Sequence, residues 1–155
     1  MSRSNMLVVK LRPKMPYSFN SSNLIQLLLD NGWSISNSEG MVAYLPVGDN
    51  DSFNWQCVHM TEEELWKIID VKTENNELIG LQLYWKSDNP GLDLLVSHSR
   101  DDGGDYFDVN IGMDLYRKDI ISELSLPNYN WYARHILTHF WKKYHISQYS
   151  FQSYN

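Results

Sequence analysis

The sequence has one cysteine, no long apolar run and a shortage of basic residues, and each shortage excludes a class of protein. Cys57 has no second cysteine to pair with, which excludes an internal disulfide and a multi-cysteine metal site. No stretch approaches the roughly 18 apolar residues of a membrane-spanning helix. The apolar run at residues 6–9 is too short for a secretory signal. We therefore expect a cytoplasmic protein with no membrane partner.

Basic residues are outnumbered, because 13 Lys and Arg stand against 19 Asp and Glu and give a formal charge of −6 at pH 7. A general affinity for nucleic acid needs the opposite sign, so we expect no nucleic-acid partner. The 155 residues, 43% of them hydrophobic, suit a single globular domain over residues 1–155. A chain of this length buries enough surface to fold without a disulfide or a metal.

Motifs of catalysis are also missing. The chain has no phosphate-binding loop, dinucleotide fingerprint, nucleophile elbow or kinase signature. We therefore expect no enzyme activity, no cofactor and no bound metal. His135 and His139 are four residues apart on an expected helix, but two ligands make a weak metal site. Cys57 and His59 share one face of an expected strand, yet their acidic segment disfavours a reactive thiolate, so we expect a buried, structural cysteine.

Hydrophobic spacing predicts the elements of the fold. A strand is expected at 6–11, and a helix begins after the capping run Asn20-Ser21-Ser22 and ends at Asn31-Gly32. Thr61 and Glu64 have the spacing of a capping box, which predicts a helix up to residue 71 or 72. The other expected elements are a strand pair at 33–35 and 41–45, a strand at 53–59, a helix over 130–144 whose apolar stripe includes Trp141 and Tyr144, and a final strand or ordered tail over 146–155.

The period of hydrophobicity changes to two between residues 78 and 115. Apolar residues alternate with polar ones in three sets, separated by Asp-, Asn- and Gly-rich turns at 86–91 and 99–104. This pattern predicts three consecutive antiparallel strands, a meander with one face in water. We therefore expect an α+β fold, in which helices pack on one face of an antiparallel β-sheet.

Charge is unevenly distributed along the chain. The formal charge is +2 over residues 1–48, −11 over residues 49–123 and +3 over residues 124–155. An acidic surface of this kind speeds and orients encounter with a basic partner. The run at 101–105 lacks the ligand spacing of a calcium loop, and we interpret it as a hairpin tip. The expected partner-binding residues lie on that hairpin and at the start of the helix after Thr61: Asp101, Asp102, Asp105, Tyr106, Asp108, Glu62 and Glu63.

The acidic composition, the alternating region 78–115 and the closing run Asn130-Trp131-Tyr132 resemble small bacterial immunity proteins. These are the cognate inhibitors in polymorphic-toxin and contact-dependent growth-inhibition systems. The resemblance implies a cytoplasmic, non-enzymatic protein that binds a toxin domain, often a basic nuclease, and blocks its active site or substrate path. Two alternatives stay open: a small metal-dependent or acid/base enzyme that uses His135, His139 or the aspartates at 101–108, and a homo-oligomeric structural subunit.

Overall fold

The computed structural model describes residues 4–14, 20–86, 92–113 and 129–154. Its elements, in chain order, are β1 (Ser4–Pro13), α1 (Ser21–Leu29), β2 (Trp33–Ser34), β3 (Met41–Tyr44), β4 (Gln56–His59), α2 (Glu62–Glu74), β5 (Ile79–Trp85), β6 (Leu92–Asp101), β7 (Gly104–Gly112), α3 (Tyr129–Tyr132), the π-helical turn η1 (Ala133–Leu137), α4 (Thr138–Phe140) and β8 (Tyr144–Tyr154).

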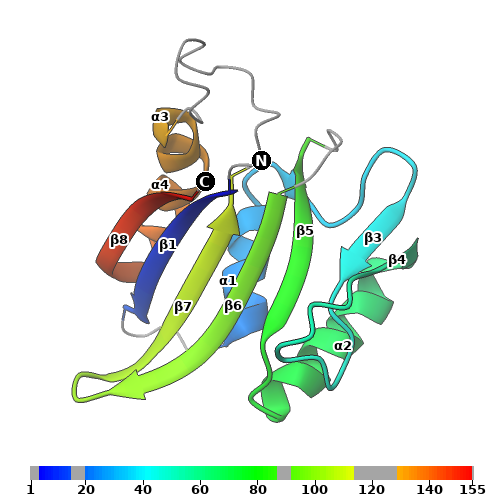
Figure 1. Cartoon of the computed structure of the whole chain (residues 1–155), viewed down its shortest axis with the longest axis horizontal. Coiled ribbons are helices and arrows are strands. Elements are labelled where there is room, and N and C mark those ends of the chain that lie inside the picture. Colours follow the sequence, from blue (N-terminus) through cyan, green and yellow to red (C-terminus); the bar gives the residue numbers. More distant parts are fainter. Residues whose placement is uncertain (1–3, 15–19, 87–91, 114–128, 155) are drawn as a thin grey trace.

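One antiparallel sheet organises the molecule, with the strand order β4-β3-β5-β6-β7-β1-β8. The strand β2 pairs with β5 beside this path. The helices lie together on one face of the sheet, and the other face of the sheet is turned toward the viewer in Figure 1. This arrangement confirms the α+β fold expected from the sequence.

The predicted meander is confirmed as β5, β6 and β7. Leu81 lies opposite Leu94, which in turn lies opposite Ile111, so apolar residues align across the three strands. In β7 the side chains of Val109 and Ile111 are fully buried, while Asp108 and Asn110 are half-buried on the other face. This alternation places the core between the sheet and the helices.

Both early helices begin where their capping residues predict. The side chain of Asn20 accepts a hydrogen bond from the backbone N–H of Ser22 at the start of α1, at 2.7 Å. The Oγ1 of Thr61 accepts from the backbone N–H of Glu64 at the start of α2, at 3.1 Å. Each cap satisfies a backbone donor that the first turn of a helix leaves unpaired.

The expected pairing of residues 33–35 with 41–45 is wrong. Trp33 and Ser34 pair with β5, and a single bridge from Ser36 to Val42 joins this segment to β3. Trp33 is 4% exposed, and its ring lies 5.4 Å from that of Trp85 and 5.9 Å from that of Trp131. Burial of these large rings outweighs the local turn signal.

The C-terminal region differs from the expected helix at its end. The helix stops at Phe140, and Tyr144 begins β8 instead of closing the helix. Trp141 is 63% exposed and so does not belong to the apolar stripe. The expected final strand or tail is a strand of 11 residues, which pairs along the whole of β1. This long-range pairing outweighs the helical spacing of the local sequence.

Candidate functional site

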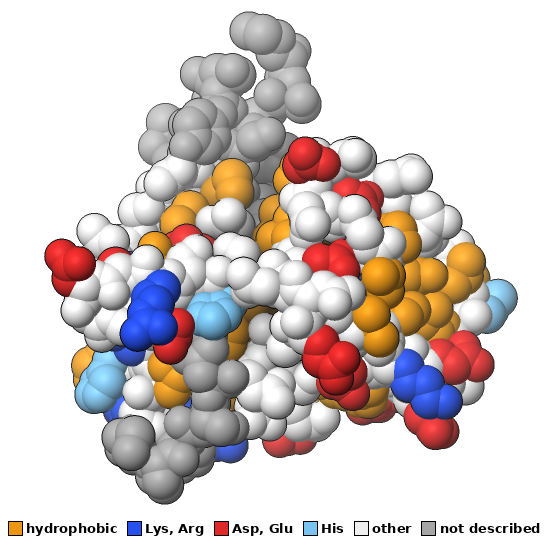
Figure 2. Space-filling model, turned by 90° about the horizontal axis from the view of Figure 1, so that it is seen from below, with side chains coloured by type: hydrophobic (Ala, Val, Ile, Leu, Met, Phe, Trp, Pro, Cys, Tyr) orange, Lys and Arg blue, Asp and Glu red, His pale blue; other side chains and the backbone are white. Residues whose placement is uncertain are grey.

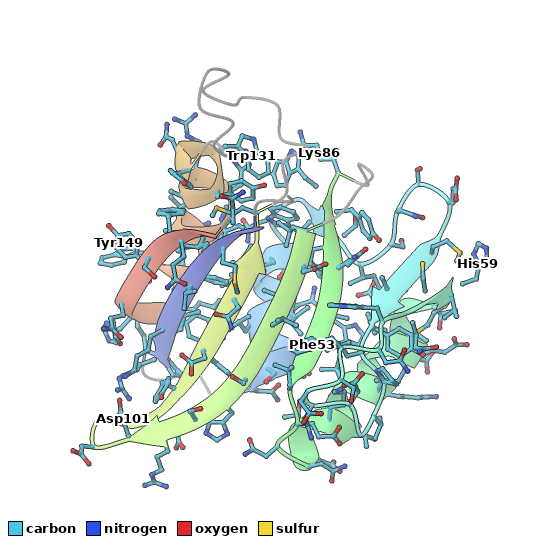
Figure 3. All side chains as sticks on the ribbon, in the orientation of Figure 1. Phe53, His59, Lys86, Asp101, Trp131 and Tyr149 are labelled. Atoms are coloured by element: carbon cyan, nitrogen blue, oxygen red, sulfur yellow. The ribbon has the colours of Figure 1, made fainter. Side chains whose placement is uncertain are left out.

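The β6–β7 hairpin carries the first group of expected partner-binding residues. Asp101, Asp102 and Asp105 are exposed around the turn, and Tyr106 and Asp108 are half-buried on β7. Figure 3 shows Asp101 at the far end of the hairpin, away from the helices. The structure therefore brings these five residues together at one end of the molecule.

Cations of β1 neutralise part of this hairpin. The Asp101 carboxylate accepts hydrogen bonds from Arg12 at 2.6 and 2.7 Å and from Lys10 at 2.6 Å. The Arg12 guanidinium, followed by the Lys10 ammonium, holds the pKa of Asp101 well below its usual range. The Lys10 Nζ also lies 4.1 Å from the centre of the Tyr106 ring, a cation–π distance. Both Asp101 and Tyr106 are thus engaged within the protein.

Cations also offset part of the remaining negative charge of the hairpin. His98 contacts the Asp105 carboxylate at 2.9 Å, and Arg100 lies opposite Asp105 in the sheet. With Lys10 and Arg12, Arg100 makes three cations against the four aspartates at 101–108, so the formal charge of this end is −1. Sequence reasoning missed this balance because β1 lies about 90 residues away in the chain.

The concentrated negative charge lies at the other end of the sheet, around α2 and the loop before β4. Residues 49–77 hold eight acidic residues and two lysines, a formal charge of −6 that equals the charge of the whole chain. Glu62 and Glu63, the second expected site, are exposed here at the first turn of α2. The exposed charged residues of this range are Asp51, Glu62, Glu63, Glu64, Lys67, Asp70 and Glu74. We call this region the acidic end.

One of the two lysines is buried and shapes this end. Lys72 is 1% exposed, and its Nζ donates to the backbone carbonyls of Leu45, Pro46 and Asp49 at 3.2, 2.7 and 3.1 Å. Burial lowers the pKa of Lys72, and the nearby carboxylates of Glu77 and Asp49 oppose this shift. A signal for this role exists in the sequence, since Lys72 follows Leu65 and Ile69 at the spacing of the buried face of α2.

The Asp49 side chain orders the rest of the loop. Its carboxylate accepts hydrogen bonds from the backbone N–H groups of Ser52, Phe53 and Asn54, at 3.0, 3.1 and 2.7 Å. These bonds, the one from Asn54 first, lower the pKa of Asp49. The loop holds Phe53 with a φ of 51°, a region that residues other than Gly, Asn and Asp rarely adopt, and leaves its side chain 48% exposed. The loop therefore presents an aromatic ring on an ordered backbone.

Exposed apolar residues accumulate at the acidic end. Besides Phe53, the large side chains Val47, Val58 and Val71 are 48%, 38% and 42% exposed. Figure 2 shows hydrophobic side chains next to carboxylates on the side of the molecule that holds β4 and α2. Carboxylates around exposed apolar side chains are typical of a protein–protein contact surface.

The two expected binding regions are not neighbours. The hairpin tip extends beyond the lower end of β1, whereas β4, the edge strand, and α2 lie toward the other edge of the sheet (Figure 1), with His59 of β4 at the outer side (Figure 3). The two regions are therefore separate candidate contacts.

The cysteine and the histidines do not belong to a metal-binding cluster within the described ranges. Cys57 is exposed on β4, so the expectation of a buried cysteine is wrong. His135 stacks on Trp131 at 4.0 Å, and its Nδ1 forms a hydrogen bond of 2.7 Å with the Trp131 carbonyl oxygen, which gives it a packing role. No group of three or more His, Cys, Asp or Glu that could hold a metal ion occurs in residues 4–14, 20–86, 92–113 and 129–154.

Comparisons with known proteins give no further assignment. The chain matches no protein-family model, no curated protein and no solved structure. In the part of the chain that the structure describes, no helix is long and apolar enough to cross a membrane.

Proposed function

We propose that this protein is an immunity-type inhibitor, which binds a basic bacterial toxin domain and blocks its active site or substrate path in the cytoplasm. The observation that carries the proposal is the acidic end, where six exposed carboxylates accompany one exposed lysine and four exposed apolar side chains. A nuclease holds phosphates with Lys and Arg, and carboxylates are the groups that pair with those cations.

The two kinds of residue at the acidic end serve different steps of binding. Exposed carboxylates such as Glu62 and Glu63 raise the rate of encounter with a cationic surface and orient it. Apolar groups such as Phe53, which the Asp49 and Lys72 contacts hold in place, supply the desolvated centre of a contact. A loop ordered before binding also loses less conformational entropy when the complex forms.

This proposal moves the main contact from the hairpin to the acidic end. Asp102 and Asp105 remain exposed on the hairpin, but the cations of β1 and β6 leave that end with a formal charge of −1. A cationic partner is therefore attracted more strongly to α2 and its neighbouring loop.

A matched pair of variants tests the proposal against whichever toxin domain a neighbouring gene encodes. One variant carries Glu62→Gln and Glu63→Gln, and the other carries Asp102→Asn and Asp105→Asn, so the formal charge changes equally. The Trp66 Nε1–H donates to the Glu62 carboxylate at 3.1 Å, and the amide introduced by Glu62→Gln keeps an oxygen that can accept this bond. Isothermal titration calorimetry measures the affinity of each variant, and co-expression measures protection from the toxin.

We expect the glutamine variant to bind at least about fivefold more weakly, and the asparagine variant to bind like the native protein. A stronger loss in the asparagine variant would place the contact on the hairpin. If the native protein forms no complex with the toxin domain, the inhibitor function itself is refuted. Light scattering of the protein alone separates a monomeric inhibitor from a homo-oligomeric subunit.

A further inference from the structure

A second surface, far from the acidic end, lies between the C-terminal helical segment and β8. A groove of about 440 Å³ opens there. Its lining is mostly apolar, with Ala133 and Leu137 from η1 and Ile146 from β8, and it is bordered by Arg134 and Trp141. Neither the acidic end nor the β6–β7 hairpin contributes to this groove.

A π-helical turn shapes the groove. The backbone N–H of Thr138 donates to the carbonyl of Ala133, five residues earlier, where an α-helix would bond four residues earlier. Ala133, Arg134 and Leu137 belong to this turn and line the groove. Turns of this kind are rare and occur frequently at functional sites, because the wider turn changes the direction of the side chains around it.

Lys14 fixes the most exposed wall of the groove. Trp141 is 63% exposed, and the Lys14 Nζ donates to its backbone carbonyl at 2.6 Å and lies 5.2 Å from the centre of its ring. An exposed tryptophan held in this way offers a large contact area at little cost in side-chain entropy.

The strand beside the groove has an available outer edge. Among the described strands, β8 pairs with β1 alone. Its 11 residues contain no Lys, Arg, Asp, Glu or Pro, the residues that natural proteins use to block pairing at an edge. Tyr149 is 61% exposed on this strand, and Figure 3 shows it at the outer side of the sheet. A further strand added here would place alternate side chains over the groove.

We infer that β8 and the groove bind an extended, acidic segment of another protein, whose backbone pairs with β8 and whose apolar side chain enters the groove. The charge of the described region selects this occupant, because Arg134 borders the groove, Lys142 and Lys143 directly precede β8, and residues 129–154 contain no acidic residue.

Three fluorescein-labelled peptides test this inference by fluorescence anisotropy on the full chain: EDTLTLDE, the basic KRTLTLRK and the anchorless EDTSTSDE. We expect the acidic leucine peptide to bind at least about tenfold more tightly than either of the others. Ala133→Trp, which fills the groove, and Arg134→Glu should each weaken its binding at least about tenfold. Circular dichroism checks that each variant is folded, and Trp141→Ala, at an exposed position, provides a second groove variant.

The inference is overturned if the basic peptide binds equally well, or if the acidic peptide fails to bind at millimolar concentration. It is also overturned if the native protein forms a dimer that Ala133→Trp dissociates, since a second copy would then occupy the groove. The Glu62→Gln, Glu63→Gln variant should bind the acidic peptide like the native protein. This control separates the two proposals: if the proposed toxin contact proves wrong, the result for peptide binding at the groove still stands.

Discussion

Replacing the buried lysine of α2 with methionine tests how the acidic end is built. Lys72→Met keeps a flexible apolar chain of similar length but removes the ammonium that donates to three backbone carbonyls, those of Leu45, Pro46 and Asp49. A buried acceptor that loses its partner costs about 1–3 kcal/mol. Relief from burying an ammonium, worth several kcal/mol, offsets part of this loss. We therefore predict that the free energy of unfolding falls by about 2–4 kcal/mol.

Urea unfolding measures this loss, and Lys67→Met is the matched control. Lys67 is exposed on the same helix, so its replacement should change the free energy of unfolding by no more than about 0.5 kcal/mol. Amide hydrogen exchange locates the effect, because we expect faster exchange at Ser52, Phe53 and Asn54 in the Lys72 variant. An unchanged midpoint, or unchanged protection of these three amides, would refute the role given to Lys72.

Three further substitutions test separate parts of the structure. Phe53→Asn should raise the free energy of unfolding by about 0.5–1 kcal/mol, because asparagine tolerates the φ of 51°. The same substitution should weaken toxin binding. Urea unfolding measures the first effect and calorimetry the second, and a loss of stability would contradict the backbone argument. Burial raises the pKa of Tyr144 to about 12 from 10.0. Since this tyrosine ionises at a lower pH in the unfolded chain than in the folded one, the free energy of unfolding should fall by roughly 2–3 kcal/mol between pH 10 and pH 12. Unfolding curves of Tyr144→Phe should lack that part of the alkaline decline, and an identical decline in the variant would contradict the burial of the Tyr144 hydroxyl. Gly80→Ala should lower the free energy of unfolding by about 1–3 kcal/mol, because the new methyl group would meet Leu45 Cδ1 at 2.5 Å. Thermal unfolding measures this loss, and a midpoint equal to the native one would contradict the prediction by showing that Leu45 moves aside freely.

Local signals in the sequence were sufficient for much of the fold. The caps at Asn20 and Thr61 and the alternation of β5, β6 and β7 act between residues close in the chain, and the structure has them as predicted. The pairing of Trp33 with β5 was not predictable in this way, since it depends on rings contributed by Trp85 and Trp131.

The candidate site depended even more on distant residues. The aspartates at 101–108 look strongly acidic in the sequence, yet Lys10 and Arg12 reach Asp101 from a strand about 90 residues earlier. The groove beside β8 depends on a π-helical turn, and the spacing at 130–144 predicted an ordinary helix. Of the expected binding residues, Glu62 and Glu63 lie where the described surface is most acidic, because eight of the ten charged residues at 49–77 are acidic.

The most direct test of the acidic end is the salt dependence of the association rate constant with the proposed toxin partner, measured by stopped-flow fluorescence. Between about 20 mM and about 500 mM salt, we predict that the rate constant falls more than tenfold. The Glu62→Gln, Glu63→Gln variant should show a weaker salt dependence, and the Asp102→Asn, Asp105→Asn variant should follow the native protein. A rate constant that does not change with salt, or that responds to the hairpin variant alone, would contradict docking through the acidic end.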